Sequence, residues 1–185
     1  MKLIILGPPG SGKGTQAKVL AKDLKLKHIS SGDLLRKEEA NGTVFGKKIR
    51  VYMEKGNLIP DKLMDSFISK NIPKNNFISD GYPRRVREAQ FLDSIRDIDY
   101  VIVLDVPYHI IQARLLKRAK IEGREDDNIE TIKHRFKVYR EETQPVLKYY
   151  QDKVLLIDGD NTPEAIEKEL LKMLKNANRN SKIKP

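Results

Sequence analysis

The chain has 185 residues, with 36 Lys or Arg against 26 Asp or Glu and a formal net charge of +10. A single domain of this length can bury a sizeable core, since domains near 150 residues remove roughly two thirds of their unfolded surface from water. The absence of cysteine excludes disulfides, thiolate zinc sites and cysteine nucleophiles. The excess of positive charge indicates anionic partners, either nucleic acid or small phosphorylated ligands.

Strands and helices are predicted to alternate along the chain. In order, we expect a strand at 1–6, a glycine-rich turn at 7–12, a helix at 13–24, a strand at 28–30, a helix capped by Ser31, a helical stretch around 44–52, a helix at 60–68, a strand at 75–79, a turn at 80–83, a strand at 100–106, a helix at 108–119, a charged loop at 123–128, a long helix at 129–150, a strand at 154–157 and a helix at 163–174. Pro145 is expected to bend or interrupt the long helix, because proline lacks the N–H that a helix needs. The tail at 176–185 has no apolar stripe and is expected to fray.

This alternation predicts an α/β fold with a parallel sheet, helices on both faces, and ligands at the carboxyl ends of the strands. The apolar run nearest the N-terminus, residues 3–6, is far shorter than a signal peptide core or a membrane span. We therefore expect a cytoplasmic protein that has no membrane partner.

A phosphate-binding loop is predicted between the first strand and the first helix. Residues 7–15 read GPPGSGKGT, which has the spacing of Gly, four residues, then Gly-Lys. Glycines allow backbone N–H groups to approach phosphate oxygens, the helix adds its positive dipole end, and Lys13 supplies a full charge. The strict pattern has Ser or Thr directly after the Lys, whereas here Gly14 stands there and Thr15 follows. The alternative is an ordinary glycine-rich turn, but the strand before it and the helix after it favour the phosphate loop.

Several arginines and one carboxylate suit the same chemistry. Asp80 ends a predicted strand and can hold Mg²⁺ through its waters, although Asp before Gly is also a common turn residue. Each arginine alone is typical of a solvated surface. Together they can neutralise the charge on a phosphoryl group during its transfer. Phosphoryl transfer needs alignment and charge stabilisation more than covalent catalysis. The arginines considered are Arg84, Arg118, Arg124 and Arg135.

The chain resembles the nucleoside monophosphate kinases, and most closely the short-form adenylate kinases. The resemblance covers about residues 1–174 and is carried by motifs in the same order along the chain. These motifs are GPPGSGKGTQ at 7–16, ISSGDLLR at 29–36, GNLIP at 56–60, DGYPR at 80–84, LLKR at 115–118, GREDDN at 123–128 and IDG at 157–159.

The resemblance implies a five-stranded parallel sheet of the P-loop NTPase type, with a helical NMP-binding insertion and a short lid. It implies one kinase domain at 1–176, with a core at 1–29, 60–117 and 128–176, an NMP-binding segment at 30–59, a lid at 118–127 and a flexible tail at 177–185. The implied reaction is ATP + AMP ⇌ 2 ADP with Mg²⁺ and without zinc. Nucleotides are the expected partners. Both a monomer and a trimer occur among relatives of this kind, and the sequence does not separate them.

The resemblance also implies roles for individual residues. The implied catalytic residues are Lys13, Arg84, Arg118, Arg124 and Arg135. The implied ATP-binding residues are Gly10, Ser11, Gly12, Lys13, Gly14, Thr15, Arg118 and Asn161. The implied AMP-binding residues are Ser31, Arg36, Asn57, Leu58, Ile59, Gly81, Tyr82, Pro83, Arg84, Glu88, Arg124 and Arg135. The implied metal ligands, acting through water, are Asp33 and Asp80.

Two positions depart from the family pattern. Glu88 stands where the family usually has a Gln that reads adenine, and Ser31 replaces the commoner Thr. A Gln amide both donates and accepts hydrogen bonds, whereas an ionised Glu only accepts. A UMP/CMP kinase or a broad-specificity nucleoside monophosphate kinase is therefore the main alternative.

Two alternatives come from other functional classes. A basic nucleic-acid-binding module would account for the net charge, but aromatic residues make up only 6% of the chain and no basic recognition helix is evident, so we expect no nucleic-acid partner. A nucleotide-binding switch would bind ATP and transfer nothing.

Overall fold

The sheet is the centre of the molecule. The structure is a computed structural model that describes residues 1–122 and 128–181. Five parallel strands lie in the order β2-β3-β1-β4-β5. They are β1 (Lys2–Leu6), β2 (Lys27–Ser30), β3 (Phe77–Asp80), β4 (Tyr100–Asp105) and β5 (Val154–Asp158). The predicted five-stranded parallel α/β sheet is confirmed, and each strand ends within two residues of the expected bounds.

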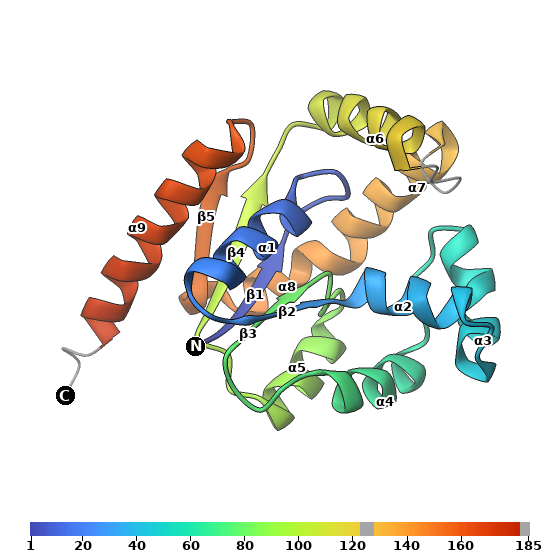
Figure 1. The fold of residues 1–185 in the computed structure, drawn as a ribbon, viewed down its shortest axis with the longest axis horizontal. Helices are drawn as coiled ribbons and strands as arrows, with labels where there is room; N and C mark the ends of the chain where they lie inside the picture. Colours follow the sequence, from blue (N-terminus) through green and yellow to red (C-terminus); the bar gives the residue numbers. More distant parts are fainter. Residues whose placement is uncertain (123–127, 182–185) are drawn as a thin grey trace.

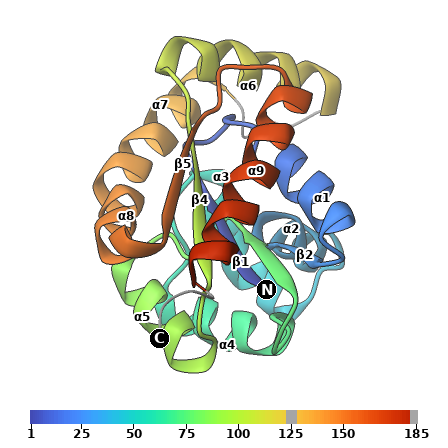
Figure 2. The same cartoon turned by 90° about the vertical axis from the view of Figure 1, so that its left-hand side faces the viewer.

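Helices cover both faces of this sheet (Figures 1 and 2). Because successive side chains of a strand point to opposite faces, β1 contributes Ile4 and Leu6 to one core and Leu3 and Ile5 to another. The first core is closed by α4 (Asp61–Asn71), α5 (Val86–Ile95) and α8 (Gln144–Tyr149). The second core is closed by α1 (Lys13–Asp23) and α9 (Pro163–Ser181).

Residues 30–59 form a helical insertion that lies beside the sheet rather than on it (Figure 1). It consists of α2 (Ser31–Ala40) and α3 (Val44–Glu54), which pack on each other. A Cβ at Gly46 would lie 2.1 Å from the Glu38 carbonyl oxygen, so this close crossing requires glycine. The expected helical insertion is confirmed.

The predicted long helix is divided into three segments. It contains α7 (Ile129–Val138), a π-helical segment (Tyr139–Thr143) and α8, followed by a short 3₁₀ turn (Gln151–Lys153) before β5. Pro145 lies in the first turn of α8, directly after the π-helical segment. The expected interruption at Pro145 is confirmed, because a proline cannot donate to the carbonyl one turn earlier.

Some local predictions are wrong. Ser30, not Ser31, caps α2, because Ser30 keeps the extended backbone of β2 and its side chain accepts from the Asp33 N–H. Helix α5 was not predicted at all, although Ala89 and Leu92 form its buried face. Helix α6 (Tyr108–Glu122) extends beyond residue 119.

The expected fraying of the C-terminal tail is also wrong for residues 176–181, which continue α9. No glycine or proline stands between residues 164 and 181 to stop the helix, and helix propagation needs no apolar stripe once the preceding turns are anchored. Residues 182–185 of the predicted tail lie outside the described residues.

Candidate active site

An open cavity of about 410 Å³ lies where β1, β2 and β3 end, and Leu6, Ser30 and Asp80 mark those ends on its wall. Helices α6 and α7 border it on one side and the 30–59 insertion borders it on another (Figure 1). In the part of the chain that the structure describes, seven Lys and Arg side chains line the cavity against three carboxylates. The cavity therefore suits a ligand that carries several negative charges.

The phosphate loop forms one wall of this cavity. Gly10 and Gly12 have φ angles of 81° and 91°, which residues other than glycine rarely adopt. A Cβ at Gly10 would also lie 2.7 Å from Leu115 Cγ. No side chain caps the N-terminus of α1, and no acidic residue stands in its first turn. The first N–H groups of α1 therefore remain available to an external anion, at the positive end of the helix dipole.

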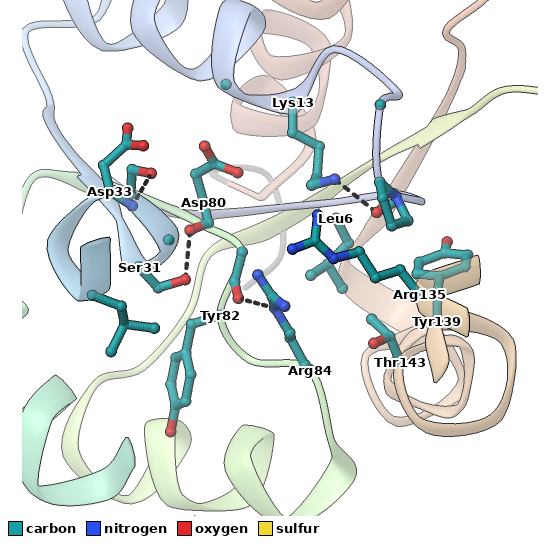
Figure 3. A pocket seen from close by; sticks show the side chains of 18 of the residues that line it. Leu6, Lys13, Ser31, Asp33, Asp80, Tyr82, Arg84, Arg135, Tyr139 and Thr143 are labelled. Carbon is teal, nitrogen blue, oxygen red and sulfur yellow. Dashed lines mark hydrogen bonds between the residues drawn. The ribbon is translucent and has the colours of Figure 1, made fainter. Parts of the chain in front are cut away.

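Lys13 lies within this loop. Its Nζ donates to the Gly7 and Pro8 carbonyl oxygens at 2.9 Å each (Figure 3). Burial is the main cause that lowers the pKa of Lys13, Asp80 opposes it, and repulsion from Arg84 and Arg118 adds to it, so that the pKa is about 8. A bound phosphate would place negative charge next to the Lys13 ammonium and stabilise its charged form.

Arg84 is the second centre of positive charge. Its Nε donates to the Gly81 carbonyl oxygen at 2.7 Å, and its backbone N–H donates to Glu88 Oε2 at 2.7 Å (Figure 3). Burial lowers the pKa of Arg84, repulsion from Arg135 and Arg36 adds to this, and Glu88 and Asp80 oppose it. Five distant stretches of chain therefore hold like charges close together, which is unfavourable unless a polyanion binds.

Two carboxylates can serve a metal ion. Asp80 is buried at the end of β3, and a Cβ at Gly14 would lie 3.4 Å from its Oδ2, so its carboxylate faces the phosphate loop. Asp33 lies in the first turn of α2 and pairs with Arg36. No cluster of three metal-ligating side chains occurs among the described residues. The donor set fits Mg²⁺, which keeps most of its waters and binds through one or two carboxylates together with substrate phosphates.

The remaining residues that were predicted to bind AMP lie on the insertion side of the cavity and next to it. Ser31 is buried, and its Oγ donates to the Asp80 carbonyl oxygen at 3.1 Å. Asn57 Oδ1 lies 2.7 Å from His134 Nε2, which links the insertion to α7. Leu58, Ile59, Gly81, Tyr82 and Glu88 also line the cavity.

Glu88 is a structural part of this wall. It is only 2% exposed, and besides holding the Arg84 N–H its own carbonyl accepts from the Tyr82 hydroxyl at 3.3 Å. Burial raises the pKa of Glu88, although the hydrogen bond from the Arg84 backbone and the charges of Arg84 and Arg85 lower it. Its carboxylate thus fixes the 81–84 turn that presents Arg84.

The structure brings most of the predicted site residues to this one cavity. The cavity wall includes Gly10, Gly12, Lys13, Gly14, Thr15, Ser31, Asp33, Arg36, Asp80, Arg84, Arg118 and Arg135, in addition to the acceptor residues named above. Ser11 is buried and does not line the cavity, and neither does Pro83. Asn161 is exposed in the loop before α9, outside the cavity lining. Arg124 and the part of the predicted lid at 123–127 lie outside the described residues.

Sequence reasoning missed several residues of the site. Arg114 lines the cavity while donating to the Gly159 carbonyl oxygen at 3.1 Å. His28 Nε2 lies 3.4 Å from Asp80 Oδ2, next to the proposed metal ligand. Tyr139 and Thr143 of the π-helical segment also line the cavity. The positions of Arg114 and Arg118 one helical turn apart were a usable signal for Arg114, but no local pattern pointed to the other three.

Comparison with known proteins gives a consistent result. A family model described as adenylate kinase matches residues 5–155. The chain is 42% identical over 171 residues to an adenylate kinase of Thermus thermophilus, covering 89% of this chain and 91% of that protein. It is 45% identical over 184 residues to adenylate kinase 1 of Synechocystis sp., covering 94% and 96%. It is 37% identical over 186 residues to an adenylate kinase of Thermobifida fusca, covering 95% and 98%. Among the described residues, no helix is both long and apolar enough to cross a bilayer.

Proposed function

Because the chain belongs to the adenylate kinase family, we infer that it catalyses the reversible transfer of a phosphoryl group from ATP to AMP, which yields two ADP. The observation that carries this inference is the single cavity shared by the phosphate loop, the 30–59 insertion and the cations between them. Two nucleotides must meet end to end in this reaction, so their phosphates share one centre of positive charge.

We assign the donor ATP to the phosphate loop. The N–H groups at the start of α1 and the ammonium of Lys13 would bind its β- and γ-phosphates, and Arg118 would add a further positive charge from the cavity wall. Asn161 remains the proposed contact of the ATP base. The segment 118–127 is proposed as the lid, with Arg124 on the transferring group.

The acceptor AMP is assigned to the insertion side. Ser31, Arg36, Arg84 and Arg135 would surround its phosphate, and residues 57–59 together with Glu88 would lie along the rest of the nucleotide. Asp33 and Asp80 would hold a hydrated Mg²⁺, which supplies further charge neutralisation at the donor phosphates.

The chemical step then follows from position and charge. An oxygen of the AMP phosphate attacks the γ-phosphorus of ATP in line, the bond to the β,γ-bridging oxygen breaks, and that oxygen leaves on ADP. Lys13, Arg84 and Arg135 stabilise the charge spread over the transferring oxygens. Both substrates, once bound, would displace bulk water from the cavity, and this matters because water is a competing acceptor. We place the enzyme in the cytoplasm, with nucleotides as its partners.

An acceptor panel tests this proposal. ADP formation from ATP is measured with AMP, CMP, UMP and GMP in turn, and AMP should give the highest kcat/KM. A pyrimidine nucleotide as the best acceptor would instead assign the chain to the UMP/CMP alternative. Absence of transfer to every acceptor would reject the kinase function.

A further inference from the structure

Thr143 is a buried cavity residue to which neither the sequence nor the family resemblance gives a role. It is only 5% exposed and lines the cavity. No hydrogen bond joins its Oγ1 to any residue of the described part of the chain. Oγ1 is nevertheless not one of the fully buried atoms without a partner, so the oxygen itself is accessible. The hydroxyl therefore opens into the cavity, where a ligand can supply the missing partner.

The π-helical segment explains why Thr143 points there. An α-helix turns about 100° per residue, so residues 135, 139 and 143 would drift about 80° around a regular helix. A π-helix has a wider turn, of about 4.4 residues, so the step from Tyr139 to Thr143 turns back by roughly 30°. The segment Tyr139–Thr143 thus returns Thr143 to the helix face that carries Arg135.

Thr143 is placed at the acceptor end of the site. Figure 3 shows Thr143 on the cavity wall near Arg84, on the same helical wall as Arg135 and Tyr139. Arg84 and Arg135 repel each other strongly enough to affect the pKa of Arg84, so an anionic group between them is favourable. A neutral hydroxyl next to this pair can donate a hydrogen bond to that anion without adding repulsion.

We propose that Thr143 is a binding residue for the acceptor nucleotide, its hydroxyl donating to the phosphate oxygen held between Arg84 and Arg135. The proposal rests on the function inferred above. The π-helical segment is the device that brings the hydroxyl to this phosphate.

The test is AMP binding to full-length protein, measured by isothermal titration calorimetry without any donor. Thr143→Val removes the hydroxyl and keeps a β-branched side chain, and its Kd for AMP should rise about ten-fold to a hundred-fold, as expected for a lost hydrogen bond to a charged group. Thr143→Ser keeps the hydroxyl and should retain an AMP affinity close to that of the wild type. Thermal unfolding of Thr143→Val should be unchanged or occur at a higher temperature, because no intramolecular hydrogen bond is lost.

Thr131→Val is the matched control, since Thr131 lies on α7 and is absent from the cavity lining. It should leave the Kd for AMP unchanged. Wild-type affinity in Thr143→Val, or an equal loss in Thr131→Val, would overturn the proposal. If Thr143→Val fails to fold, Thr143→Ala must show the same loss of AMP affinity, and wild-type affinity in that variant overturns the proposal equally. A wild-type protein that binds no AMP would instead contradict the proposed function.

Discussion

Lys13 allows a quantitative test of the charge cluster in the ligand-free protein. Its pKa falls from 10.5 to about 8, mainly because its ammonium is buried. A shift of about 2.5 units corresponds to about 3 kcal/mol of unfavourable free energy for the charged form in the folded state. Below pH 8 Lys13 is charged in both states, so the folded protein carries this penalty in full. Above pH 10.5 Lys13 is neutral in both states and the penalty is absent.

The sign follows from proton linkage. Between pH 8 and 10.5 the unfolded chain binds more protons at this site than the folded protein, so the stability of the wild type rises with pH. Lys13→Met removes the titration. The free energy of unfolding of Lys13→Met, relative to the wild type, should therefore fall by about 2.5 kcal/mol between pH 7 and pH 10. The hydrogen bonds from Nζ to Gly7 and Pro8 contribute nearly equally to the free energy of unfolding at pH 7 and at pH 10, so their loss largely cancels in this difference.

Urea unfolding at the two pH values measures this difference. Lys22→Met, on the exposed side of the same helix, controls for the loss of a lysine. If wild type and Lys13→Met differ by the same free energy at pH 7 and pH 10, burial and repulsion do not act on Lys13 as argued here.

Two further predictions concern the acceptor side. Arg84→Ala should lower kcat about 100-fold to 1,000-fold while the protein remains folded, because a charge aimed at the transferring group is lost. Steady-state kinetics measures kcat, and a thermal melt checks that the variant is folded. Retained activity would refute the assignment of Arg84. Glu88→Gln should shift the acceptor profile toward AMP, because an amide can donate to the base as well as accept, and it can still accept the Arg84 N–H that Glu88 now holds. The ratio of kcat/KM for AMP over CMP checks the second prediction, and an unchanged ratio would show that Glu88 acts only on the turn.

The sheet and the phosphate loop could be predicted because their signals are local. The loop at 7–15 carries its glycines, its lysine and its flanking strand and helix within a few residues, and the four-residue apolar runs at 3–6 and 101–104 lie in strands. Helix α5 also had a usable signal, since Val86, Ala89 and Leu92 repeat at helical spacing.

Other parts of the site depend on tertiary contacts that no local pattern encodes. The pairing of His28 with Asp80 arises because β2 and β3 are neighbours, although they lie about fifty residues apart in sequence. The orientation of Thr143 depends on a π-helical turn, and a periodicity of 3.6 residues assigns Thr143 to a different face. The motif order predicted that Arg84, Arg118 and Arg135 lie at one site, but the repulsion between Arg84 and Arg135 became visible only from the fold.

The lowered pKa of the buried Lys13 also predicts that substrate binding takes up a proton. In the ligand-free protein at pH 8.5, a Lys13 pKa of about 8 means that Lys13 is neutral in most molecules. A bound triphosphate surrounds the ammonium with negative charge and raises its pKa, so each binding event should take up about 0.7 proton from the buffer. Calorimetric titration of ATP in two buffers of different ionisation enthalpy measures this number, and Lys13→Met should take up far less. If the wild type takes up no proton at pH 8.5, the phosphates do not bind next to Lys13.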